Sequence, residues 1–270
     1  MEYLTELAEW SELSFMALLL VVLFVVHEAG ARIARRSLTR EEKAPEGVNV
    51  IVGGLLGLLA FVLALTLSYA SARFNERRAG ALSEANVIST AWTRAEAIGH
   101  RRGKEIARLL EEYARVRQGF VEAGRDKAKL AEFNRTTQAL QSEMTGHLAA
   151  IVQERPDTVS TSLMTSLNET FDAATTERFA YDRGLPAPVF WLLMSLSVLS
   201  AAALGYQVGF VRQRPRLLVA VLMLAWTSVT IVILDLASPR LGALRTNSDA
   251  YVWTLQSFKS GVQIPPAPNR

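Results

Sequence analysis

Cysteine is absent from the 270-residue sequence, and histidine occurs three times. Without cysteine the chain forms no disulfide, no thiolate zinc site, no iron–sulfur cluster and no cysteine nucleophile. His27, His100 and His147 lie far apart, and none is paired with another His or Glu at the spacing that zinc or di-iron sites require. The sequence therefore predicts neither a metal site nor a cofactor.

A strong excess of one charge sign is also lacking. The chain has 29 Lys and Arg against 26 Asp and Glu, which gives a formal net charge of +3. This near balance argues against a nucleic-acid partner. The sequence has neither a Gly-x-Ser-x-Gly nucleophile elbow nor a phosphate-binding loop that ends in Gly-Lys-Ser/Thr. We expect no catalytic residues and no enzymatic activity.

Long apolar runs are present, although 20% of the residues are charged and the mean hydropathy is only +0.18. A helix needs about 20 apolar residues to cross the hydrocarbon core of a bilayer. Four segments satisfy this requirement, at about 15–33, 48–70, 189–211 and 217–236. We predict four transmembrane helices and the lipid bilayer as a partner.

The first apolar segment could alternatively be a signal peptide, because its uninterrupted apolar run is short. The region before it carries Glu2, Glu6, Glu9 and Glu12 and neither Lys nor Arg. A signal peptide begins with positive charge, so this pattern favours a retained membrane anchor.

The orientation follows from Lys and Arg in the short loops, because these residues resist translocation. Both short loops are basic, with Arg32, Arg35, Arg36, Arg40 and Lys43 in the first and Arg212, Arg214 and Arg216 in the second. We place both loops in the cytoplasm of a cell whose inner (plasma) membrane holds the chain. The amino terminus, the central domain and the carboxyl terminus then lie outside.

The region between the second and third spans shows helical rather than strand periodicity. Residues 74–95 predict a helix that continues the second span, and further helices are expected at about 104–122, 130–151 and 159–171. These amphipathic helices have to bury their apolar stripes, in a bundle or coiled-coil stalk or, alternatively, on a lipid surface. The mixed charges on their polar faces favour the bundle.

The predicted fold class is thus all-α, with four transmembrane helices and an extramembrane helical bundle inserted between the second and third spans. The expected domains are an N-terminal membrane pair (1–70), the helical domain (71–187), a C-terminal membrane pair (188–237) and a C-terminal tail (238–270).

Three stretches of the sequence carry a resemblance to a known family. They are Arg73 to Arg78 with Glu84 to Ala91 and Arg94; Leu167, Asn168, Glu169, Asp172 and Arg178 ahead of Pro188 to Trp191; and Leu234, Asp235 and Leu236 ahead of Pro239, Arg240 and Gly242. The chain resembles the bestrophin-like domain family, bacterial membrane proteins of unknown function, from about residue 53 to 255. The resemblance implies a four-span membrane protein and invites comparison with bestrophins, pentameric anion channels with four spans per subunit. Bestrophins hold the inserted helical region in the cytoplasm, whereas the Lys and Arg pattern here predicts it outside.

Gly53, Gly54 and Gly57 in the second span are candidate pore or packing residues. Small residues four apart let two helices approach closely in lipid.

Polar residues on the two helices that connect to the second and third spans form a second candidate site, comprising Glu84, Asn86, Arg94, Asn168, Glu169, Asp172 and Arg178. If these helices pack antiparallel, Glu84 or Glu169 can pair with Arg178 or Arg94 and fix their register. We favour this inter-helix clamp over an ion-binding site.

Asp235 and Arg240 are candidate membrane-interface charges near the end of the fourth span. Charged groups at membrane depth are costly and are usually paired or functional. The two residues either line an ion path or have a structural role, as an ion pair or a helix cap, and we favour the structural role.

Two hypotheses for the function follow. The chain is either a channel-like homo-oligomer that conducts ions or a membrane-anchored helical scaffold or sensor without transport activity.

Overall fold

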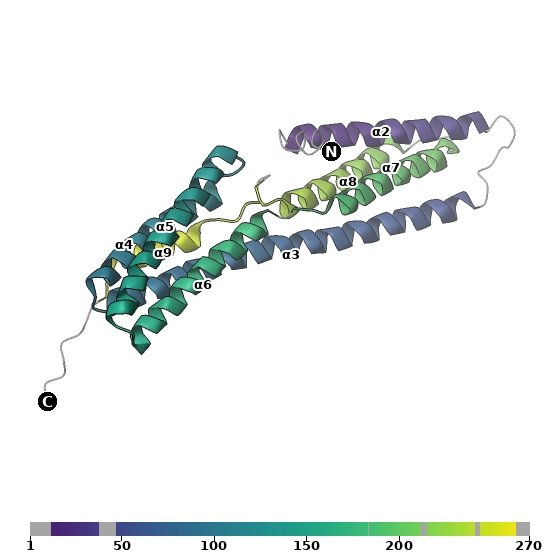
Figure 1. The fold of residues 1–270 in the computed structure, drawn as a ribbon. Helices are drawn as coiled ribbons and strands as arrows, with labels where there is room; N and C mark the ends of the chain where they lie inside the picture. Colours follow the sequence, from purple (N-terminus) through teal and green to yellow (C-terminus); the bar gives the residue numbers. More distant parts are fainter. Residues whose placement is uncertain (1–11, 38–46, 183, 212–214, 241–243, 263–270) are drawn as a thin grey trace. The chain divides into compact units, whose positions relative to one another are not determined.

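The computed structural model describes residues 12–37, 47–182, 184–211, 215–240 and 244–262, and the regular secondary structure in these ranges is entirely helical. Its helices, drawn in Figure 1, are α2 (Glu12–Ser37), α3 (Val48–Ala97), α4 (Arg101–Glu122), α5 (Lys127–Glu154), α6 (Thr158–Tyr181), α7 (Ala187–Gly209), α8 (Arg216–Ala237) and α9 (Asp249–Lys259). The chain divides into two compact units, residues 1–73 with 184–244 and residues 74–183 with 245–270.

The first unit contains α2, the first part of α3, α7 and α8. Each of these helices is long and apolar enough to cross a membrane. Only 22% to 33% of their most apolar windows is buried within the chain, so most of that surface faces outward. Among the described residues the prediction of an all-helical chain with four candidate spans is confirmed.

Close approach of backbones joins α2 to α7. A Cβ atom added to Gly205 would overlap the carbonyl group of His27, and one added to Gly30 would overlap that of Ala202. Glycine is therefore required on both helices for this contact. This pair of glycines was not among the residues predicted from the sequence.

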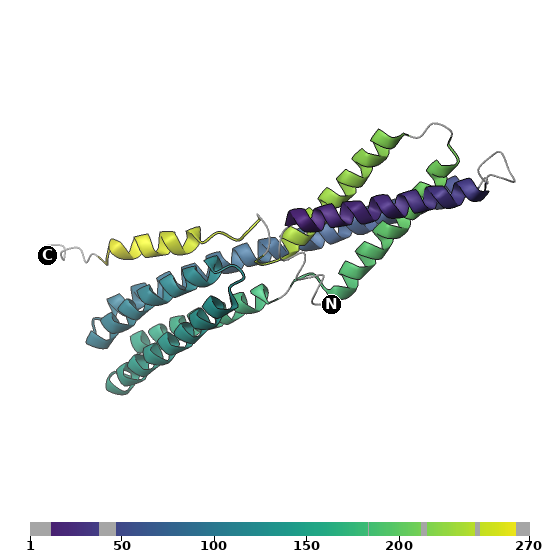
Figure 2. The same cartoon turned by 90° about the horizontal axis from the view of Figure 1, so that it is seen from above.

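Two apolar clusters complete the first unit. Leu23, Ala201 and Met223 belong to a cluster that joins α2, α7 and α8. A second cluster joins α3, α7 and α8 and includes Leu59 and Leu193. Figure 1 shows α7 and α8 between α2 and the first part of α3, and Figure 2 shows α2 crossing α7.

The second unit consists of the last part of α3 with α4, α5, α6 and α9, which share one apolar core. Its helices begin at polar caps. Asp126 accepts hydrogen bonds from the N–H groups of Ala128 and Lys129 at 3.0 Å, and Asp157 forms a capping box with Ser160. These caps set where α5 and α6 begin.

The helix α3 continues without a break from the second span to Ala97, as the periodicity predicted. The predicted helices at 104–122, 130–151 and 159–171 correspond to α4, α5 and α6, of which α6 continues ten residues further, to Tyr181. Helix α9 lies in the segment expected to be a tail. It packs on α3 through the rings of Phe258 and Trp92, whose centroids are 4.7 Å apart.

Helices α3 and α6 pack antiparallel within the second unit. Arg94 Nη1 donates a hydrogen bond to the Ser162 carbonyl at 2.9 Å, and Thr170 Oγ1 donates one to the Val87 carbonyl at 3.3 Å. Along the contact, residue numbers increase on α6 as they decrease on α3, so the two helices run in opposite directions. The antiparallel arrangement on which the predicted clamp depends is present.

The orientation prediction depends partly on residues outside the described ranges. These are the basic residues Arg40, Lys43, Arg212 and Arg214; three of the glutamates that argue against a signal peptide, at positions 2, 6 and 9, also lie outside them.

Candidate functional site

The candidate glycines of the second span lie on an exposed face of α3. Apart from its own turn of helix, a Cβ atom added to Gly53, Gly54 or Gly57 would have no described atom within 4 Å. Exposed Ala60 and Ala64 continue the series from Gly53 and Gly57 at steps of three and four residues, so these four positions share one side of the helix. We call them the small-residue face. Packing within the described subunit does not explain its glycines.

A different side of α3 carries large apolar side chains. Ile51, Leu58 and Leu65 follow one another at steps of seven residues, with exposed fractions of 71%, 51% and 55%. This apolar face is the kind of surface that lipid covers. The outer surface of α3 is thus divided into two parts of different character.

Asp235, near the end of α8, binds the backbone that follows this helix. Its two carboxylate oxygens each lie 3.3 Å from the Leu244 nitrogen, which donates to them. The carboxylate therefore holds the chain as it turns away from α8. Arg240 lies two residues beyond the Ser238 that ends the helix and is half-buried.

A buried ion pair lies inside the second unit. Glu84 on α3 accepts hydrogen bonds from Arg117 Nε at 2.5 Å and Nη2 at 3.1 Å, and from the Tyr251 hydroxyl at 2.7 Å. The side chains of Glu84 and Arg117 are 0% and 1% exposed. The carboxylate of Glu84 thus connects α3, α4 and α9.

The electrostatic environment keeps the Arg117 guanidinium charged and the Tyr251 phenol neutral. Burial opposes the charge of Arg117, but the Glu84 carboxylate raises the pKa of the guanidinium above its ordinary range. Burial, together with Glu84, raises the pKa of Tyr251 well above its usual value, so the phenol remains a hydrogen-bond donor. The same two causes raise the pKa of Tyr113.

Glu177 on α6 is a second buried carboxylate of this unit, and it differs from Glu84. Its side chain is buried, and neither carboxylate oxygen has a hydrogen-bond donor among the described residues. Burial first, and repulsion from Glu84 second, raise the pKa of Glu177 to about 8, although Arg117 and Arg77 act in the opposite direction. Because its pKa is raised, Glu177 is largely protonated at neutral pH. Its carboxyl group lies against Gly80, where an added Cβ atom would overlap it.

The predicted polar clamp has different partners in the structure. Glu84 pairs with Arg117 rather than with Arg94 or Arg178, and Arg94 binds a backbone carbonyl of α6. The remaining candidates are exposed on α3 and α6: Asn86, Asn168, Glu169, Asp172 and Arg178. Among the described residues, side chain to backbone hydrogen bonds join the two helices, and the expected ion pairs are not seen.

Three side chains of the buried cluster were missed by the sequence analysis. They are Arg117, Glu177 and Tyr251. A signal existed for Arg117, because it lies on the apolar stripe of α4 between Tyr113 and Phe120, where a charge has to find a buried partner. In the described part of the chain, no three His, Asp or Glu residues come together as a metal-binding group.

The arrangement of helices was compared with known proteins. No family model matches the sequence, and no curated protein does. The structure matches a bacterial bestrophin homolog from Klebsiella pneumoniae in a mutant form, with a TM-score of 0.70 and 14% identity over 92% of this chain and 99% of that chain. A second structure of that homolog matches with a TM-score of 0.64 and 15% identity, over 93% and 98% of the two chains.

A mutant of a protein described only as a membrane protein also matches, with a TM-score of 0.68 and 14% identity, over 88% of this chain and 96% of that chain. At these identities the likeness concerns the fold. The chain has the fold of bacterial bestrophin homologs over nearly its full length, which confirms the resemblance at that level.

Proposed function

We propose that this chain is one subunit of a homo-oligomeric ion channel of the bestrophin type, with the small-residue face of α3 directed toward the axis of the oligomer. The fold supports the channel class, since bestrophins are ion channels. In this proposal, residues 1–70 and 188–237 form the membrane domain, and residues 71–187 form an extramembrane helical domain.

The observation that carries the proposal is the small-residue face. A glycine inside a helix costs about 1 kcal/mol relative to alanine, and the described residues of one subunit give no steric reason for Gly53 and Gly57 on this face of α3. A second subunit packed closely against α3, or a pore that needs space, supplies that reason. The neighbouring apolar face then contacts lipid.

Cysteine accessibility tests which face of α3 meets water, and the chain suits this method because it has no native cysteine. Ala64→Cys lies on the small-residue face, and its neighbour Leu65→Cys lies on the apolar face. In planar bilayers we expect discrete conductance. A water-soluble thiol reagent should reduce it for Ala64→Cys and leave it unchanged for Leu65→Cys.

The particle mass in detergent tests the oligomer. A ring of several subunits is expected, because a monomer offers no central pore. A monodisperse monomer, or silent bilayers from well-folded oligomers, would contradict the channel proposal.

The alternative is a scaffold or sensor, and the exposed polar side of α6 favours it. Asn168, Glu169 and Asp172 are exposed there, and neither carboxylate forms an ion pair with another described residue. Crosslinking through this side in native membranes would recover a second polypeptide if the chain is a scaffold. Self-crosslinks alone would support the homo-oligomer.

A further inference from the structure

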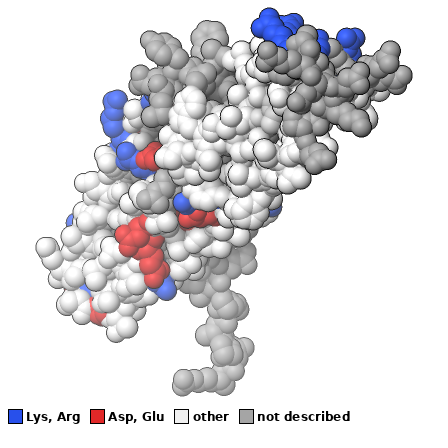
Figure 3. All heavy atoms as spheres, turned by 90° about the vertical axis from the view of Figure 1, so that its right-hand side faces the viewer, with Lys and Arg blue, Asp and Glu red and all other residues white. Residues whose placement is uncertain are grey.

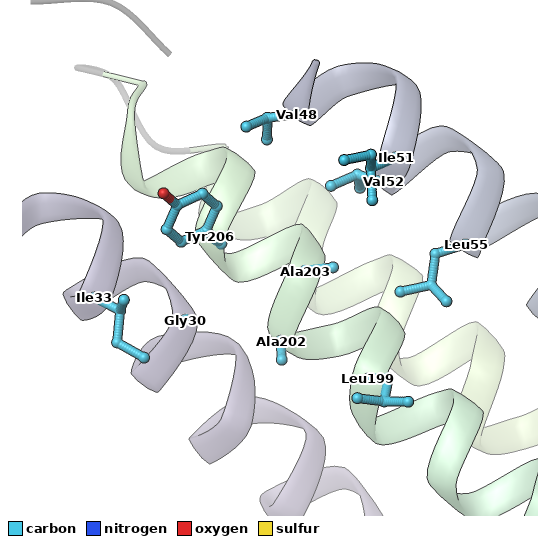
Figure 4. Close-up of a pocket in the computed structure, with 10 residues that line it drawn as sticks. All are labelled: Gly30, Ile33, Val48, Ile51, Val52, Leu55, Leu199, Ala202, Ala203 and Tyr206. Carbon is cyan, nitrogen blue, oxygen red and sulfur yellow. The ribbon is translucent and has the colours of Figure 1, made fainter. Parts of the chain in front are cut away.

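An apolar groove of about 460 Å³ runs along the first unit between α2, α3 and α7 (Figure 4). Its walls are formed by Gly30 and Ile33 of α2, by Val48, Ile51, Val52 and Leu55 of α3, and by Leu199, Ala202, Ala203 and Tyr206 of α7. All three helices are candidate membrane spans, so the groove opens to lipid. Its chemistry suits a hydrocarbon chain.

The groove lies near one end of these three helices. Ile33 is four residues from the end of α2, Val48 begins α3, and Tyr206 is three residues from the end of α7. Among the residues that line the groove, Tyr206 carries the polar side chain, and its ring packs edge-on against Phe210. Beside it, Gln207 donates a hydrogen bond to Asn49 at 2.9 Å. Tyrosine at a membrane interface commonly directs its hydroxyl to the headgroup level.

Positive charge is present at the same end. Arg36 follows Ile33 by three residues on α2, and positions three apart on a helix share a side. Arg216, at the start of α8, lines a separate pocket with His27 and Glu28 and is not part of this groove. Figure 3, which faces the right-hand side of Figure 1, shows Lys and Arg side chains gathered at its top. An anionic headgroup matches this charge, whereas a zwitterionic one matches it less well.

We infer that the groove binds one acyl chain of an anionic glycerophospholipid, with the lipid phosphate beside the Tyr206 hydroxyl and Arg36. The inference does not depend on ion conduction, since it requires only that α2, α3 and α7 lie in a bilayer.

Native mass spectrometry of the purified protein with added phosphatidylglycerol or phosphatidylcholine tests this site. Ala203→Phe fills the groove, and Val221→Phe introduces the same side chain at an exposed position of α8 that does not line it. We expect several-fold lower occupancy by phosphatidylglycerol for Ala203→Phe and unchanged occupancy for Val221→Phe. Arg36→Gln should lower the preference for phosphatidylglycerol over phosphatidylcholine by roughly five-fold.

Helix content and melting temperature of each variant, measured by circular dichroism, show whether the fold is retained. If folded Ala203→Phe binds as much lipid as Val221→Phe, the groove is not the site. If the two lipids bind equally well to the unmodified protein, the inferred headgroup contact is wrong. A conducting protein with an empty groove, or a silent protein with an occupied one, separates this inference from the channel proposal.

Discussion

Two buried carboxyl groups in the core of the second unit, those of Glu84 and Glu177, are accommodated in different ways. Glu84 receives two bonds from Arg117 and one from Tyr251, and these offset the loss of hydration of both charges. Glu177 has no such donors and is accommodated by remaining protonated. The same apolar core thus contains one carboxylate paired with a guanidinium and a second carboxyl group that is largely neutral.

Removing one partner of the ion pair should be far more harmful than removing an exposed charge on the same helix. Arg117→Ala leaves Glu84 buried without its guanidinium, and we expect a loss of about 3–5 kcal/mol of unfolding free energy. Arg115→Ala, two residues away, removes an exposed arginine 3.4 Å from Glu111 and should change it by less than about 1 kcal/mol. Thermal unfolding in detergent, followed by circular dichroism, measures both. Equal effects would show that the pair is not essential to the core.

Glu177 makes the stability of the protein depend on pH. Its pKa of about 8 in the folded state lies above its ordinary value of 4.5, so the folded state binds more protons than the unfolded state between these two values. Stability from this residue therefore decreases as pH rises from about 4.5 to 8, at most by about 1.4 kcal/mol per pH unit, and changes little above that range.

Glutamine cannot lose a proton, so the stability of the variant Glu177→Gln should fall less as pH rises. Melting temperatures at pH 6 and pH 9 should differ less for the variant than for the unmodified protein, and the variant should be the more stable of the two at pH 9. Glu169→Gln on the exposed side of the same helix is the control. If both variants keep the full decline, another group is responsible.

At the scale of helices, two classes of glycine in the first unit have different purposes. Gly205 permits contact between α2 and α7 inside the subunit, whereas Gly57 meets nothing within it. Gly205→Ala should therefore lower the melting temperature of the subunit, because its methyl group would overlap the His27 carbonyl. Gly57→Leu should leave the helix content intact and weaken the oligomer.

Size-exclusion chromatography with light scattering, together with circular dichroism, separates these two effects. Leu58→Ala on the apolar face is the control for Gly57→Leu. An unchanged oligomer with Gly57→Leu would argue that the small-residue face is not a subunit contact.

Apolar periodicity predicted most of the helices, because each long helix has to bury a stripe of its own. Helix α9 was not predicted because it has only 11 residues. Its burial depends on Trp92 and Glu84, which are distant in sequence. For a related reason, the partner of Glu84 was not predicted either. Arg94 and Arg117 were both available, and only the packing of α4 against α3 brings Arg117 to the carboxylate.

At the scale of the whole molecule, the membrane orientation gives the sharpest test that the sequence offers. Lys and Arg in the short loops predict the helical domain outside, the reverse of the bestrophin arrangement. Ser142→Cys, exposed on α5, should then react with a membrane-impermeant maleimide added to intact cells or spheroplasts. Val211→Cys, exposed at the end of α7, should react only after the membrane is opened. The background is clean because the chain has no native cysteine. The opposite labelling pattern would place the helical domain in the cytoplasm, as in bestrophins, and would show that Arg73, Arg77 and Arg78 after the second span outweigh the short loops.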